Sequence, residues 1–117
     1  MVKMENNKGS VSISKDVFNN LAGAAATSCF GVKGMAIRSV SDGLVHLLKR
    51  ESMGKGVCVT YNEDGTISIE LHIIVNNGVN IPELCRSIIN EVSFKVSAAT
   101  GVVISSVNVF VDSISIN

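Results

Sequence analysis

Three cysteines (Cys29, Cys58 and Cys85) and two histidines (His46 and His72) are the side chains best suited to nucleophilic, acid–base or metal chemistry. No two cysteines have the spacing of a zinc site, and an odd number does not make a disulfide framework. Free thiols suit a reducing compartment. We therefore expect no metal, no cofactor and a cytoplasmic location.

Cys58 and His72 fall on the polar sides of two neighbouring predicted strands. The register of those strands places Cys58 beside Ser68 or Glu70, so a Cys–His pair is not expected, and no third group orients one. Cys29 and Cys85 lie on or beside helical apolar stripes, which indicates inert core thiols. His72 is expected to be a surface histidine without a catalytic role.

Two glycine clusters invite a comparison with ligand-binding loops. Gly54-Lys55-Gly56 could cradle a phosphate, but it matches neither a P-loop nor a dinucleotide fingerprint, and an ordinary loop is the simpler interpretation. Gly31 and Gly34 around Lys33 resemble the nucleic-acid clamp of KH-like domains. Turn geometry explains these glycines more simply.

Length and charge limit the classes of function. The chain has 117 residues, ten basic and ten acidic, which gives no electrostatic footprint for nucleic acid. Residues 1–8 are expected to be a disordered tail, without the apolar stretch of a signal peptide, and residues 9–117 a single domain. No run approaches the ~20 apolar residues that span a bilayer, so any membrane contact is expected to be indirect, through a partner.

The first half of the chain predicts a short strand, a helix and a second short strand. Val11 and Ile13 alternate with serines, and Ser14 then caps an Ala-rich helix whose apolar stripe runs through Val17, Leu21 and Ala25. Residues 31–37 are typical of a turn that enters a strand. Residues 41–50 predict a short third helix, with His46 on its solvent side.

A β-hairpin follows, with strands at 57–61 and 67–73. Residues that pair directly must share a face, so the connecting loop holds an odd number of residues, three or five. Asn80 and Glu83 then resemble a capping box for a helix that holds its apolar stripe for about five turns and ends at Gly101. The last strand shifts its apolar phase near Ser113, which indicates a bulge or a strand end.

These elements predict an α+β, two-layer fold: one mixed β-sheet of four to five strands, two main helices on one face and a short third helix. The other face of the sheet is predicted to be polar, with one apolar exception. Its residues are Ser68, Glu70, His72, Asn108, Phe110 and Asp112.

An ordered set of short motifs resembles the alkaline shock (general stress) protein family of bacteria over roughly residues 9–112. The set comprises Ser10–Ser14, Gly31–Met35, Gly56–Val59, Ile73–Val75, Gly78–Ile81, Thr100-Gly101 and Val107–Val109. Within these motifs the residues expected to shape the backbone are Gly31, Gly34, Gly78, Asn80, Gly101 and Asn108. Residues 39–55 match no family motif, and a long charged tail is lacking, so the chain resembles a compact member.

The resemblance implies a cytoplasmic, non-catalytic protein of the stress response or cell envelope that acts through protein partners or self-association. The candidate interaction residues are Arg38, Lys49, Arg50, Lys55, His72 and Phe110. A small-ligand-binding or regulatory module for a metabolic enzyme is the alternative, and a KH-like nucleic-acid binder is a weaker one. The basic residues around 38–55 would suit an acidic partner or a membrane surface.

Overall fold

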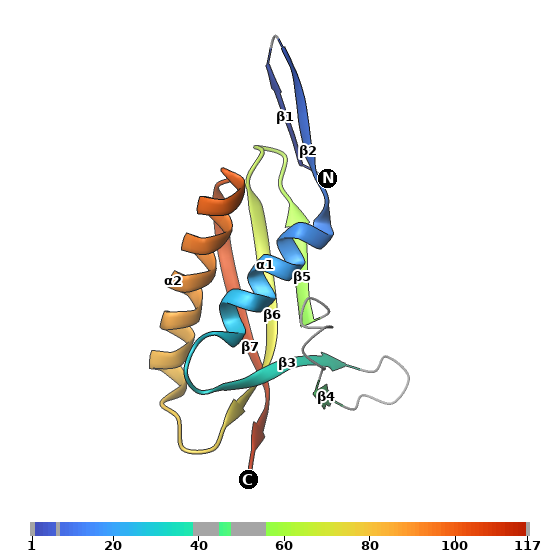
Figure 1. Ribbon diagram of the computed structural model, residues 1–117. Helices are drawn as coiled ribbons and strands as arrows, with labels where there is room; N and C mark the ends of the chain where they lie inside the picture. The colour runs from blue at the N-terminus through green and yellow to red at the C-terminus, as the bar shows by residue number, and fades with distance from the viewer. Residues whose placement is uncertain (1, 7, 39–44, 48–55, 117) are drawn as a thin grey trace.

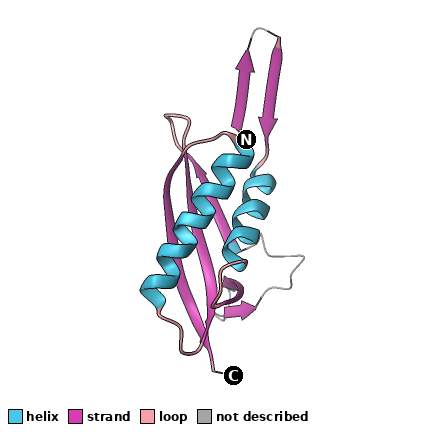
Figure 2. Ribbon diagram, turned by 60° about the vertical axis from the view of Figure 1, so that its left-hand side comes forward, coloured by secondary structure: helices cyan, strands magenta, loops and turns pink. Residues whose placement is uncertain are grey.

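The computed structural model describes residues 2–6, 8–38, 45–47 and 56–116. In chain order, the elements are β1 (Val2–Asn6), β2 (Gly9–Ile13), α1 (Lys15–Thr27), β3 (Val32–Arg38), β4 (Val45–Leu47), β5 (Val57–Tyr61), β6 (Ile67–Asn76), α2 (Ile81–Thr100) and β7 (Ile104–Ser115). Both helices lie on the same face of a five-stranded sheet (Figures 1 and 2). The predicted α+β class is confirmed.

Strand β6 is the centre of the sheet. Strand β7 pairs with it in parallel from Ile67 to Asn76, whereas β5 and β3 pair antiparallel with the first and second halves of its other edge. Strand β4 pairs antiparallel with β3. The sheet is mixed, as predicted, because β7 pairs in parallel whereas the other described strands of the sheet pair antiparallel. Every second residue of β6 from Ile67 to Ile73 is fully buried beneath the helices, which explains its strict alternation.

The hairpin register agrees with the prediction. Tyr61 pairs with Ile67 and Val59 with Ile69, so the loop holds the five residues 62–66. The phase shift in the last strand is also a bulge: Ile73 pairs with Val111, but Ile74 pairs with Ser113, so Asp112 is the additional residue.

Helix α1 is rotated relative to the predicted stripe. Its buried residues include Phe18, Ala22, Ala25 and Ala26, whereas Val17 is 44% exposed. Only one face of the helix can meet the sheet, and the larger Phe18 side chain lies on that face. The prediction that Val17 belongs to the buried stripe was therefore wrong. Ser14 is the N-cap residue, as expected, but its side chain makes no capping hydrogen bond.

Helix α2 begins and ends as predicted. The Asn80 side chain accepts a hydrogen bond from the Glu83 backbone N–H at 3.2 Å. Gly101 ends the helix in the left-handed conformation, with φ +76°. Four buried apolar residues hold the helix to the core: Leu84, Ile88, Val92 and Val96.

Three other expectations need correction. Residues 2–6 are not a disordered tail: they form β1, which pairs with β2 in a separate hairpin that projects beyond the helical layer (Figure 1). The first predicted strand therefore lies outside the main sheet. The predicted third helix is wrong at Val45–Leu47, where β4 pairs with β3, because sheet pairing overrides the local apolar spacing. The rest of that predicted helix falls outside the described residues.

Candidate functional site

The sheet face opposite the helices, called here the open face, carries the six residues predicted for it: Ser68, Glu70, His72, Asn108, Phe110 and Asp112. Strands β6 and β7 bring them together because parallel pairing sets Glu70 beside Asn108 and His72 beside Phe110. Phe110 is 44% exposed. The open face is thus polar with an apolar side chain beside its histidine, as the alternation predicted.

His72 lies between two carboxylates. Its Nδ1 is 3.0 Å from Asp112 Oδ2, and its Nε2 is 3.0 Å from Glu70 Oε2. The Phe110 ring stacks on the imidazole, with centroids 5.0 Å apart and planes 12° from parallel. The ring is therefore held at both nitrogens and on one face.

This arrangement limits what His72 can do chemically. A neutral imidazole has one N–H and donates to one carboxylate, whereas an imidazolium donates to both. In either state each nitrogen already faces a carboxylate, and the Asp112 side chain is only 5% exposed. A general base needs a nitrogen within reach of the proton that it removes. These contacts suit a role in which His72 orders the side chains of the open face better than a role in proton transfer.

Of the three cysteines, only Cys58 lies on the sheet beside this cluster. Cys58 is exposed and pairs with Glu70, one of the two positions predicted for it. Burial raises the pKa of Cys29, and the nearby Glu91 carboxylate raises it further. Burial also raises the pKa of Cys85. Raised values keep these thiols protonated and poorly nucleophilic.

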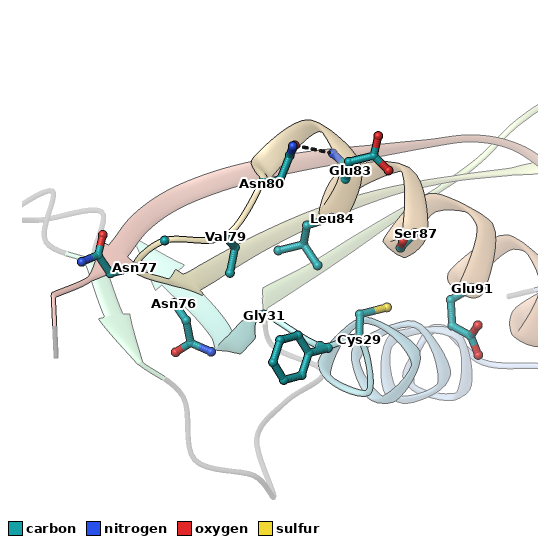
Figure 3. A pocket seen from close by; sticks show the side chains of 12 residues that line it. Cys29, Gly31, Asn76, Asn77, Val79, Asn80, Glu83, Leu84, Ser87 and Glu91 are labelled. Carbon is teal, nitrogen blue, oxygen red and sulfur yellow. Dashed lines mark hydrogen bonds between the residues drawn. The ribbon is translucent and has the colours of Figure 1, made fainter.

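A second candidate site, called here the interhelical groove, lies between the end of α1 and the start of α2 (Figure 3). It has a volume of about 560 Å³. Its lining residues are Cys29, Phe30, Gly31, Asn76, Asn77, Gly78, Val79, Asn80, Glu83, Leu84, Ser87 and Glu91. Phe30 is 99% exposed. Sequence reasoning missed this groove because its two walls are distant along the chain.

Three of the predicted motif residues meet in the groove. Gly31 has φ +107°, and a Cβ there would lie 3.0 Å from Val79 Cγ1. Gly78 has φ +90°, and Asn80 caps α2. These residues shape the turns at which the two helices approach each other, which is consistent with a structural role for the motif.

The structure accounts for the other glycines in similar terms. Gly34 is buried in β3 at a register shift. Its neighbour Lys33 reaches the last strand of the chain, β7, where its Nζ donates a hydrogen bond to Ser115 Oγ at 3.0 Å. Gly56 packs so closely on β3 that a Cβ would lie 2.8 Å from the Ala36 carbonyl oxygen. Both glycines are explained by sheet packing.

The predicted basic cluster is described only in part. Arg38 is the last residue of β3, where its backbone pairs with Val45. Lys49, Arg50 and Lys55 lie outside the described residues, so their proximity stays a prediction.

Within the described ranges, no three His, Cys, Asp or Glu side chains are placed to share a metal ion. Neither α1 nor α2 is long and apolar enough to cross a bilayer.

The sequence profile of the alkaline shock protein family, described as having a cell envelope-related function, matches residues 3–116. The chain belongs to this family. It is 32% identical to the uncharacterized protein YloU of Bacillus subtilis (strain 168) over 98% of this chain and 96% of YloU. It is 34% identical to the uncharacterized protein Spy1614 of Streptococcus pyogenes serotype M6, over 98% of this chain and 95% of Spy1614. No solved structure gave a significant match.

Proposed function

We propose that the chain is a non-catalytic protein of the cell envelope or its stress response that acts through protein contacts made by the open face. It would work in the cytoplasm and reach the membrane only through a partner. Membership of a family with an envelope-related function supports this role. The observation that carries it is the exposed Phe110 ring, stacked on His72 on a sheet face that neither described helix covers.

Two physical features favour a contact surface over a catalytic one. First, the His72 contacts preorganise the Phe110 ring, which lowers the entropy that a partner's binding must offset. Second, aromatic residues with a polar surround are enriched at the centres of protein interfaces. The partly exposed Glu70 carboxylate, which contacts His72, supplies part of that surround.

A capture experiment tests this proposal. The chain and its Phe110→Ala variant would be used as baits in extracts of the native cell, with quantitative mass spectrometry of what they retain. Phe94→Ala is the matched control, because Phe94 is 69% exposed on α2, away from the open face. We expect envelope-associated proteins on the wild-type and Phe94→Ala baits and their loss from Phe110→Ala. Identical sets on all three baits would contradict the proposal.

The interhelical groove favours a second candidate function, that of a small-ligand or regulatory module. Its volume falls within the usual range for ligand sites. Glu83 and Glu91 line it, without a basic residue among its lining, so a neutral or cationic ligand suits it better than a phosphate. A thermal-shift screen tests this: stabilisation by a neutral or cationic compound, abolished by Ser87→Phe at an exposed position of the groove lining, would favour the ligand module.

A further inference from the structure

Strand β7 forms one margin of the sheet (Figure 1), and no described strand pairs with its outer edge. It spans Ile104–Ser115, and its two register shifts fall at Ser105 and Asp112. The regular stretch between them, residues 106–111, reads Ser-Val-Asn-Val-Phe-Val and contains no charge, proline or glycine. Edges of this kind are templates for pairing, and proteins usually blunt them with Lys, Pro or bulges.

The direction of the backbone groups on this edge follows from one hydrogen bond. The Ile67 N–H donates to the Val103 carbonyl at 3.1 Å, so Ile67 turns its backbone toward β7. Residues alternate along a strand, so Ile69, Leu71 and Ile73 do the same. In parallel pairing their β7 partners then point the other way. Val107, Val109 and Val111 therefore present their N–H and C=O groups at the outer edge.

We infer that this edge pairs antiparallel with β7 of a second copy of the chain, with Val109 opposite Val109 across a twofold axis. This goes beyond the proposed function, because the contact is made by the strand edge and not by the open face. The pairing must keep the helical layers of both copies on the same side of the joined sheet. In this register Val107 lies opposite Val111 and Val109 opposite Val109, so all three valines exchange backbone hydrogen bonds with the second copy. If the axis passed through Asn108, Val111 would face Ser105, and if it passed through Phe110, Val107 would face Ser113. Both of these partners lie outside the regular stretch 106–111.

Charge also favours a second copy as the occupant. The chain has ten basic and ten acidic residues, so two copies do not repel each other through net charge. In the proposed register Asp112, the sole charge on β7, lies opposite Ser106 rather than opposite its own copy. Asn108 lies opposite Phe110, so the two open faces become one continuous surface with the Phe110 rings near its centre.

Helix α2 stands off β7 at the start of the strand, just before the stretch 106–111. A hollow of about 330 Å³ separates it from the start of β7, lined by Ser93, Ser97, Gly101, Val102, Val103 and Ile104. The two α2 residues in this lining are Ser93 and Ser97, which have short side chains.

The register gives a charge-swap test in the full chain. Asn108→Lys with Phe110→Lys would place lysines opposite lysines across the axis and abolish the dimer. Asn108→Lys with Phe110→Glu changes the same two positions but places each lysine opposite a glutamate, and we expect it to restore the dimer. Mass would be measured by light scattering during size-exclusion chromatography over a wide range of concentration, with circular dichroism as the check on folding.

The expected result is a dimeric wild type, a monomeric Lys/Lys variant and a dimeric Lys/Glu variant. A monomeric wild type, a dimer that persists in Lys/Lys, or no restoration in Lys/Glu would overturn the inference. These outcomes are separate from those of the proposed function, because Lys/Glu lacks the Phe110 ring: it keeps self-association but loses partners that bind the open face. If the wild type is monomeric yet retains those partners, the edge pairing fails and the proposed function stands.

Discussion

His72 Nδ1 lies 3.0 Å from Asp112 Oδ2, although 40 residues separate them along the chain. The contact crosses from β6 to the bulge in β7, where Asp112 is the additional residue. Because the bulge aims the Asp112 side chain at the ring, it contributes directly to the order of the open face.

Replacement of His72 by alanine removes this contact and the surface on which Phe110 stacks. We expect His72→Ala to lower the free energy of unfolding by about 1–2 kcal/mol, since a nearly buried carboxylate loses its imidazole partner and an aromatic stack is lost. Urea unfolding measures this. Asn108→Ala, on the same face but exposed, serves as the control and should change stability little. Equal losses in both variants would show that the His72 contacts contribute nothing specific.

Alanine substitutions at Gly31 and Gly78 distinguish the effect of backbone strain from that of side-chain crowding. Both glycines have positive φ, but a Cβ at Gly31 would lie 3.0 Å from Val79 Cγ1, whereas a Cβ at Gly78 meets no atom within 4 Å. We expect Gly31→Ala to destabilise the fold by about 2 kcal/mol or more and Gly78→Ala by about 1 kcal/mol. Thermal and denaturant unfolding of the pair test the difference. A Gly78→Ala variant as unstable as Gly31→Ala would refute the crowding argument.

The hairpin loop gives a prediction for the effect of pH. Hydrogen bonds from the Thr66 side chain and backbone lower the pKa of Asp64 below its ordinary value of 3.8. A lowered folded-state pKa means that this stabilisation is present above pH 3.8 and is lost as the pH falls through the folded value. Thr66→Val removes the hydroxyl donor, so the pKa of Asp64 should rise toward 3.8, and NMR titration measures it. Thr66→Ser keeps the donor and should keep the lowered pKa; a rise in both variants would assign the effect to something other than the hydroxyl.

The three thiols should differ in reactivity. Cys58 is exposed, whereas burial raises the pKa of both Cys29 and Cys85 and reduces their thiolate fraction near neutral pH. We expect a thiol-specific chromogenic reagent to react in one fast phase followed by slow phases. Cys58→Ser should remove the fast phase alone, and Cys85→Ser should leave it intact. A fast phase that survives in Cys58→Ser would contradict the assignment.

Local patterns in the sequence were sufficient for the elements that bury a regular face. Strand β6 alternates strictly from Ile67 to Ile73 and α2 carries both of its caps, so the start of β6, the bounds of α2 and the hairpin register could be predicted. The three further residues of β6, up to Asn76, break the alternation and were not included in the predicted strand. The bulge in β7 was also visible, because its apolar phase shifts. In each case the deciding contacts are local or follow from the requirement that paired residues share a face.

Elements that depend on pairing with distant residues could not be predicted in the same way. Strand β1 is held by its pairing with β2, and β4 has three residues whose apolar spacing also suits a helix. The open face was predicted from alternation, but the contacts of His72 required the parallel alignment of β6 with β7. The interhelical groove combines residues 29–31 with residues 76–91, which no local pattern joins.

We propose that the open face binds a protein partner through the Phe110 ring. The most direct measurement is the dissociation constant of a partner captured on the wild type, determined by isothermal titration calorimetry for wild type, Phe110→Ala and Phe94→Ala. Truncation of a central aromatic residue costs more than about 1.4 kcal/mol, which corresponds to about tenfold or more in affinity. We predict that loss for Phe110→Ala and an unchanged affinity for Phe94→Ala. Equal affinities for all three proteins would contradict the account.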